Sequence, residues 1–258
     1  NNVSSLILCG ADNSVIYNLS LSHTQQIGTA VLVTSSNHVA IKNSEIDNVW
    51  AGIDLRYSYH AVLENLSVST LGDSIGLYQN ENNTLRNSNI SDGEDLLLVY
   101  QTIDSLITGN RFVNSSEDPI EISSWLQLTG NNSIYNNFFN NTGNINYGGS
   151  VILANKWNTT SQTGTRIHSL GTMIGGNYWA NPTETGFSET CADIDQDGFC
   201  DMSYNLTTDT PCSGVTCGNN TDFLPLSNNY TSPYDVTGCV KITQPGSYTL
   251  QNDITNSN

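Results

Sequence analysis

Four aspartates in the C-terminal third of the chain follow the spacing of a calcium-binding loop. Asp193, Asp195 and Asp197 stand on alternate residues, and Gly198 follows directly. Carboxylates on alternate residues of a tight loop can converge on one hard cation, and Ca2+ prefers such an all-oxygen shell. The loop lacks the bidentate Glu of an EF-hand, so Asp222 or another remote group would complete the shell. We predict a Ca2+ site, against the alternative of a solvated acidic turn, with the ligands Asp193, Asp195, Asp197, the Phe199 carbonyl and Asp201.

Six cysteines predict disulfides and a location outside the cytoplasm. Cys191 and Cys200 bracket the aspartate loop and would close it. The other two candidate pairs are Cys212 with Cys217 and Cys9 with Cys239. The last pair could form within the chain or between neighbouring copies. Zinc is the competing interpretation, and it is disfavoured because the chain has no C-x-x-C pair and no His close to this cluster.

The histidines offer no recognisable metal site. They are His23, His38, His60 and His168, with no i, i+2 or i, i+4 pair among them, and the chain has only 2 Met. Copper is bound mainly by imidazole and sulfur ligands. The local spacing therefore predicts no ligand set for copper handling.

Many N-x-[ST] sequons occur, and in a chain so rich in Asn, Ser and Thr a good share of them arise by chance. In an extracellular protein some would carry glycan. The candidate acceptors are Asn82, Asn89, Asn114, Asn131, Asn140, Asn158, Asn205, Asn219 and Asn229.

Charge and composition exclude several classes of protein. The 258 residues include 24 Asp and Glu against 7 Lys and Arg, which gives a net charge of −17. So few bases cannot neutralise nucleic-acid phosphates or hold an anionic membrane surface. No apolar stretch approaches the roughly 20 residues that span a bilayer, so we expect no membrane insertion. Abundant Asn, Ser and Gly favour an all-β fold with many turns.

The first half of the sequence repeats with a period of about 22 residues. Each copy has apolar residues at its first, third and eleventh positions, then Asn or Gly at the thirteenth. The first positions are Leu6, Val31, Ile53, Ile75 and Leu97, at steps of 25, 22, 22 and 22 residues. A sixth copy runs from Ile120 to Phe139 if about four residues are inserted around Ser124–Gln127, and Val151–Leu153 could begin a seventh.

Apolar residues two apart, broken by Gly, Asn or Ser, are typical of short strands and turns. One such coil cannot bury its own apolar face and must stack on a copy of itself. We therefore predict a right-handed parallel β-helix of about 22 residues per coil, with the Asn or Gly column at a bend where stacked amides can pair. A leucine-rich repeat is the rival for this period, but the Leu-x-x-Leu-x-Leu spacing is missing.

This pattern resembles the parallel β-helix repeat proteins over roughly residues 5 to 155. Their relatives include pectate-lyase-like enzymes, a periplasmic protein of copper-site maturation and surface proteins of methanogenic archaea. The resemblance implies the fold and leaves the activity open. The order of Gly176–Trp179, the Asp-rich loop and Asn219–Leu226 is similar to that of the archaeal surface proteins.

Three regions are predicted. Residues 1–170 would form the coils, and residues 171–236 a Cys- and Asp-rich, disulfide- and calcium-stabilised cap over exposed strand edges. Residues 237–258 resemble the opening of another β-helix domain. They would start a following domain, complete the helix of the next copy, or fold back as a C-terminal strand.

Catalysis finds little support in the predicted coils. Asp54 and Glu121 should point outward from the third and sixth coils, about 14 Å apart at about 4.8 Å per coil. Glycosidic cleavage needs paired carboxylates at roughly 5 to 9.5 Å. Asp54 with Arg56, beside Tyr78 and Tyr100, forms at best a small patch that could touch a sugar. We predict no catalytic residues.

We therefore expect a structural protein of the cell surface that is not an enzyme. It would assemble head to tail into an extracellular layer, sheath or filament, stabilised by Ca2+ and disulfides. Glycans would be possible partners, and nucleic acid would not. The alternatives are a polysaccharide-binding or polysaccharide-cleaving β-helix and a passive spacer module in a longer surface chain.

Overall fold

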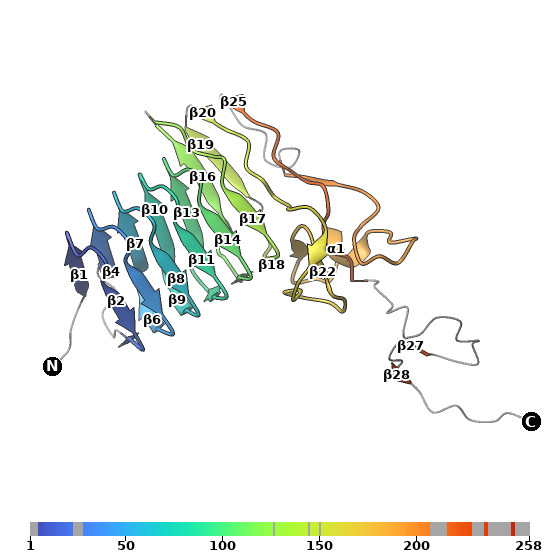
Figure 1. The fold of residues 1–258 in the computed structure, drawn as a ribbon, viewed down its shortest axis with the longest axis horizontal. Coiled ribbons are helices and arrows are strands. Elements are labelled where there is room, and N and C mark those ends of the chain that lie inside the picture. Colours follow the sequence, from blue (N-terminus) through green and yellow to red (C-terminus); the bar gives the residue numbers. More distant parts are fainter. Residues whose placement is uncertain are drawn as a thin grey trace, which may run out of the picture.

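The chain forms an all-β parallel solenoid of about six coils (Figure 1). The computed structural model describes residues 5–22, 28–125, 127–143, 145–149, 151–206, 216–228, 235–236 and 249–250. Each coil contributes one strand to each of three parallel sheets, so the predicted solenoid is confirmed. Among the described residues the only helix is α1 (Phe187–Thr190), and no helix there could cross a bilayer.

The first sheet contains β1 (Leu6–Cys9), β4 (Thr29–Thr34), β7 (Ala51–Arg56), β10 (Ile75–Tyr78), β13 (Leu97–Tyr100), β16 (Glu121–Ser124) and β19 (Asn146–Gly149). The second contains β2 (Val15–Tyr17), β5 (Ala40–Lys42), β8 (Val62–Glu64), β11 (Thr84–Arg86), β14 (Leu106–Thr108) and β17 (Ser133–Tyr135). The third contains β3 (Ser20–Ser22), β6 (Glu45–Val49), β9 (Ser67–Thr70), β12 (Asn89–Ser91), β15 (Arg111–Val113), β18 (Phe138–Asn140) and β23 (Tyr178–Ala180).

Short strand pairs complete the described structure. They are β20 (Val151–Ile152) with β25 (Thr216–Cys217), β21 (Gln162–Thr163) with β22 (Met173–Ile174), β24 (Tyr204–Asn205) with β26 (Thr221–Asp222), and β27 (Asp235–Val236) with β28 (Thr249–Leu250). The predicted tail, residues 237–258, lies outside the described residues except for β28.

Strand register follows the predicted repeat. Val31 lies opposite Ile53, which in turn lies opposite Ile75. The four-residue insertion in the sixth copy is also confirmed, because Ile107 lies opposite Ile134. The seventh copy begins earlier than predicted. Tyr147 of β19 lies opposite Ile122, whereas Val151 pairs with the cap through β25.

The interior is filled by columns of side chains in register. Val33, Leu55, Leu77, Val99 and Ile122 lie opposite one another in one column of the first sheet, and all are buried. The inward column of the third sheet becomes aromatic toward the cap, with ring centroids 5.2 Å apart for Phe112 and Phe139 and 4.4 Å apart for Phe139 and Trp179. Stacking identical apolar positions supplies the burial that a single coil lacks.

The recurrent Asn or Gly column occupies left-handed backbone, as a bend requires. The residues are Asn18, Asn43, Asn65, Asn87, Gly109 and Asn136, with φ between 49° and 69°. Asn and Gly tolerate this region better than other residues do. The amide of Asn65 donates to Asn43 Oδ1 at 3.0 Å, so amide pairing along the column is present.

Two further ladders of Asn lie inside the solenoid and end in the cap. Asn137 Oδ1 accepts the Asn110 backbone N–H, and Asn177 Oδ1 accepts that of Asn137, both at 3.0 Å. The last member is Asp222, whose Oδ2 accepts the Asn177 N–H at 2.8 Å. A parallel ladder runs from Asn132 through Asn155 to Asn220. The cap therefore continues the internal hydrogen bonding of the coils.

Candidate functional site

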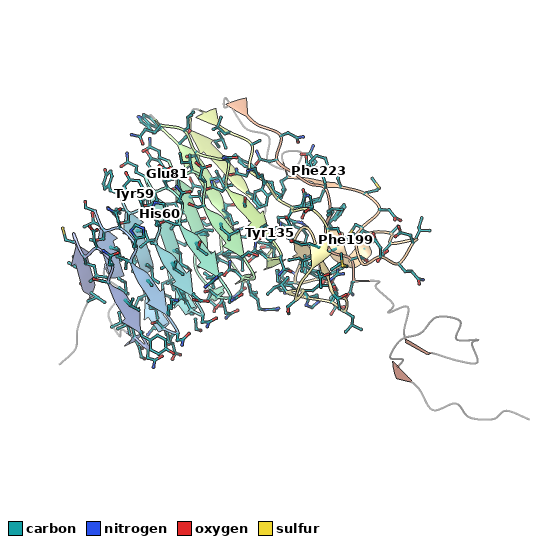
Figure 2. All side chains as sticks on the ribbon, viewed as in Figure 1. Tyr59, His60, Glu81, Tyr135, Phe199 and Phe223 are labelled. Carbon is teal, nitrogen blue, oxygen red and sulfur yellow. A yellow bond between two sulfur atoms is a disulfide. The ribbon has the colours of Figure 1, made fainter. Side chains whose placement is uncertain are left out.

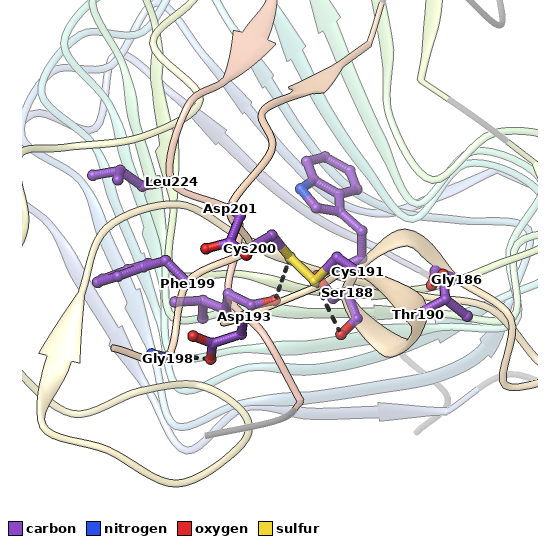
Figure 3. The surroundings of a disulfide bond; sticks show 12 residues. Gly186, Ser188, Thr190, Cys191, Asp193, Gly198, Phe199, Cys200, Asp201 and Leu224 are labelled. Atoms are coloured by element: carbon purple, nitrogen blue, oxygen red, sulfur yellow. Dashed lines mark hydrogen bonds between the residues drawn. A yellow bond between two sulfur atoms is a disulfide. The ribbon is translucent and has the colours of Figure 1, made fainter. Parts of the chain in front are cut away.

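The aspartate loop lies in the cap directly after α1. The structure forms the predicted disulfide between Cys191 and Cys200, with 5.6 Å between their Cα atoms, and this bond closes the loop (Figure 3). Gln196 and Gly198 adopt left-handed backbone, with φ of 58° and 90°. These bends bring alternate side chains of the loop to one side.

Three of the predicted ligands come together. One carboxylate oxygen each from Asp193, Asp195 and Asp197 lies within 4.8 Å of the other two. Asp193 is only 9% exposed, and its Oδ2 accepts the Gly198 N–H at 3.1 Å. Its Oδ1 is buried and has no hydrogen-bond partner in the described part of the chain. Because a buried carboxylate oxygen without a partner is costly, this atom fits a cation ligand.

The remaining predicted ligands have other surroundings. Asp201 Oδ2 accepts the Ile194 N–H at 3.0 Å, which ties the two ends of the loop together. The Phe199 side chain is buried with Phe138 and anchors the loop to the solenoid. Neither Asp201 nor Asp222 belongs to the carboxylate cluster.

Asp222 is fully buried at the end of the internal ladder instead of completing the metal shell. Its Oδ2 accepts the indole N–H of Trp179 at 2.9 Å, in addition to the Asn177 N–H, and its Oδ1 accepts the Leu224 N–H at 3.1 Å. Burial raises the pKa of Asp222 to about 7 even though these donors lower it. Asp222 is therefore part of the packing that joins cap to coils.

A second group of carboxylates lies on the outer face of the first sheet. Asp54 and Glu121 share one column, three coils apart, as predicted from the repeat. Asp54 is nevertheless only 4% exposed, with its Oδ2 held by Arg56 Nη2 at 2.7 Å. The Arg56 guanidinium also lies over the Tyr78 ring, 4.9 Å from the ring centre.

Sequence reasoning missed three acids that lie beside this column. Asp73, Asp95 and Asp118 occupy consecutive coils. Burial raises the pKa of each, and neighbouring carboxylates raise it further, to about 7 for Asp95. Their spacing of 22 and 23 residues matches the repeat, so a search for acids at that period would have found them.

The other predicted sites are the sequon asparagines and the remaining cysteines, and they differ in exposure and in whether the structure describes them. Exposed sequon asparagines are Asn82, Asn89, Asn114, Asn131, Asn205 and Asn219, and Asn140 and Asn158 are half-buried. Asn229 and the side chains of Cys212, Cys217 and Cys239 lie outside the described residues. Cys9 is exposed at the end of β1, without a disulfide partner in the described ranges. The predicted pairs Cys212 with Cys217 and Cys9 with Cys239 therefore remain predictions.

Three parallel sheets wound in stacked coils define this protein as a parallel β-solenoid. Residues 2–184 match the family described as periplasmic copper-binding protein (NosD). The match covers more than half of the chain, so the chain belongs to the NosD family. No curated protein sequence matches the chain.

The family description directs attention to imidazoles, which are common copper ligands. Although the local spacing of the histidines indicated no site, the structure places His38 and His60 together, with ring centroids 4.9 Å apart and the planes inclined by 22°. The two residues are 22 positions apart, one period of the repeat. A search for histidines one repeat period apart, in addition to the i, i+2 and i, i+4 spacings, would have found the pair. These donors fit a copper ion.

Proposed function

We propose that this protein is a structural component of the cell surface that assembles head to tail, with Ca2+ bound in its cap. Two observations support a location outside the cytoplasm. The family is described as periplasmic, and the cap carries a disulfide of the kind that persists in oxidising compartments.

The two ends of the solenoid differ, because only one of them is covered by the cap within the described residues. At one end the cap closes the internal ladders through Asn220 and Asp222. At the other end β1, β2 and β3 each pair on one side only within the described residues. Leu6 and Leu8 there are only partly buried against the core. A strand edge over apolar side chains is a template for another strand, whether that strand comes from a second copy or from an adjoining coil of the same chain.

The tail has the sequence of a coil. Val240 and Ile242 are two residues apart, Leu250 follows eight residues later, and Asn252 two after that. Leu6, Leu8, Ile16 and Asn18 have the same spacing. A tail from a second copy could therefore extend the apolar columns and the Asn column of the first coil.

This register determines whether Cys9 and Cys239 can form a disulfide across the interface. With Val240 opposite Leu6, Cys9 stands four residues from the position opposite Cys239, or about 13 Å along a strand. A disulfide requires Cα atoms within about 7 Å. The proposed register therefore excludes a Cys9 to Cys239 bond across the same interface.

Substitutions in the tail test the assembly. Serine at Val240, Ile242 and Leu250 together should leave soluble monomers, because the inward apolar set is lost. Serine at Lys241 and Gln251, which alternate with the inward positions, should leave assembly intact. Sedimentation velocity and electron microscopy would compare both with a chain ending at residue 236. Polymers formed by the shortened chain, or a full chain that stays monomeric at high concentration, would contradict the proposal.

The cap loop supports Ca2+ rather than a softer metal. Its clustered donors are carboxylate oxygens, which suit hard cations, and it contains neither imidazole nor free thiolate. The bound ion would remove the cost of the buried Asp193 oxygen. It would also offset part of the net charge of −17.

A polysaccharide-cleaving or polysaccharide-binding activity is the second candidate. The observation in its favour is Asp95, whose raised pKa of about 7 suits a general acid, with Glu121 among the carboxylates that raise it. Arg56 and Tyr78 supply polar and aromatic contacts on the same face. Release of reducing ends from a panel of acidic and neutral glycans, abolished by Asp95→Asn, would support it; no release from any glycan would count against cleavage.

A further inference from the structure

His38 and His60 belong to a second column of left-handed residues, at the turn between the first and second sheets. The column contains Asn13, His38, His60, Asn82, Asp104 and Asn131, with φ between 54° and 58°. The His38 N–H donates to the Tyr59 carbonyl at 2.9 Å, and the His60 N–H donates to the Glu81 carbonyl at 3.2 Å. The backbone therefore fixes the two residues one coil apart.

Both imidazoles face solvent in a shallow hollow. The two side chains are exposed, and Figure 2 shows His60 beside Tyr59 and Glu81 on the outer edge of the coils. The hollow has a volume of about 540 Å³ and is also lined by Asp12 and Glu81. Among the described residues no Lys or Arg lines it. Two imidazoles beside the carboxylates of Asp12 and Glu81 offer nitrogen and oxygen donors to a cation.

We propose that His38 and His60 together bind one divalent transition-metal ion, with Cu2+ the preferred ion. Each imidazole would supply one nitrogen. Because both rings are exposed, rotation about their side-chain bonds can turn two nitrogens toward one point between the coils. Water or the carboxylate of Asp12 or Glu81 would fill the remaining positions. Nitrogen ligands favour Cu2+ over the other first-row divalent ions. The site is independent of the oxygen-lined cap loop.

The column itself supplies suitable variants. Asn occupies the same turn in the neighbouring coils at Asn13 and Asn82, both in left-handed backbone. His38→Asn and His60→Asn therefore remove an imidazole while keeping a residue that tolerates this conformation. His168→Gln is the matched control, because it removes one imidazole beside Phe138, far along the chain from the pair.

Calorimetric titration of the full chain with Cu2+ in excess Ca2+ tests the proposal, together with electron paramagnetic resonance. We expect one Cu2+ per chain and nitrogen hyperfine coupling from two imidazoles. Each single variant should weaken binding at least about tenfold, since even the loss of an outer-shell partner costs about 10 to 100-fold. His168→Gln should bind as the unmodified chain does.

Unchanged affinity in both single variants, or the whole loss in only one of them, would overturn a shared site, as would spectra with oxygen ligands alone. Thermal unfolding monitors the fold of each variant. If a variant misfolds, the unmodified chain still decides the question. Bound Cu2+ should then protect His38 and His60, but not His168, from modification by diethyl pyrocarbonate, and equal labelling with and without Cu2+ would contradict the proposal.

Discussion

Asp193 differs from its neighbours in the cap loop by its burial. Asp195 and Asp197 are exposed and can be hydrated, whereas Asp193 is 9% exposed with one oxygen unpartnered among the described residues. Burial accordingly raises the pKa of Asp193. Without a cation, the loop therefore holds the buried Asp193 carboxylate at an energetic cost. A bound cation should have its largest effect on that side chain.

Replacing Asp193 by Asn should abolish stabilisation by Ca2+. At a Ca2+ concentration 100-fold above its dissociation constant, the unmodified chain should gain about 2.7 kcal/mol in the free energy of unfolding. The variant should gain little and should be no less stable without Ca2+, because it lacks the buried charge. Denaturant unfolding with Ca2+ and with chelator measures both. Asp47→Asn, the same change on an exposed strand residue, should respond to Ca2+ normally. An equal gain in the Asp193 variant would contradict the site.

At the scale of elements, the internal ladders decide how cap and coils unfold together. Asp222 has a pKa of about 7 in the folded chain against an ordinary value of 3.8. Between these values the folded state holds a proton that the unfolded state has released. Its contribution to stability is therefore fully present at low pH and is lost as the pH rises through about 7.

The free energy of unfolding should accordingly fall as the pH rises from about 4 to about 7, by up to about 1.4 kcal/mol per pH unit from this group. Asp222→Asn should flatten that slope, because an amide does not titrate. The fold should tolerate the change, because the amide of Asn220 already ends the parallel ladder in the same way. Asp95, which also has a pKa of about 7, contributes in the same direction, so Asp95→Asn is measured alongside. An undiminished slope in the Asp222 variant would show that its charge state does not change on folding.

The repeat period predicted the coils because every inward position recurs at the same spacing. It predicted neither internal ladder. Asn110, Asn137 and Asn177 are separated by 27 and then 40 residues, since an insertion and the cap interrupt the period. Buried Asn also look like the many exposed ones in this composition. In the cap, alternate spacing predicted three clustered acids. The direction of Asp201 depends on the Ile194 N–H, which spacing does not reveal.

At the scale of the whole molecule, net charge opposes assembly. Each copy carries −17, and Lys42, Arg56 and Arg86 are already engaged in ion pairs within the chain. Stacking copies brings these negative surfaces close together. Electrostatic repulsion, which salt can screen, therefore offsets part of the free energy gained by burying apolar side chains at the interface.

Salt should consequently promote assembly. Raising NaCl from about 0.1 M to about 1 M shortens the screening length from about 10 Å to about 3 Å. The assembled fraction seen by sedimentation should increase, whereas the chain ending at residue 236 should remain monomeric at both concentrations. Dissociation at high salt would instead mean that opposite charges hold the copies together.

The shared 22-residue register makes coils interchangeable units of length. Adding or removing one whole coil would leave every column continuous, from the apolar interior to the left-handed turns, and would change the distance between the first coil and the cap by about 4.8 Å. The number of coils therefore sets the distance between the first coil and the cap. Its outer residues can take on new contacts, such as the His38 and His60 pair, without altering the separation that the coils set.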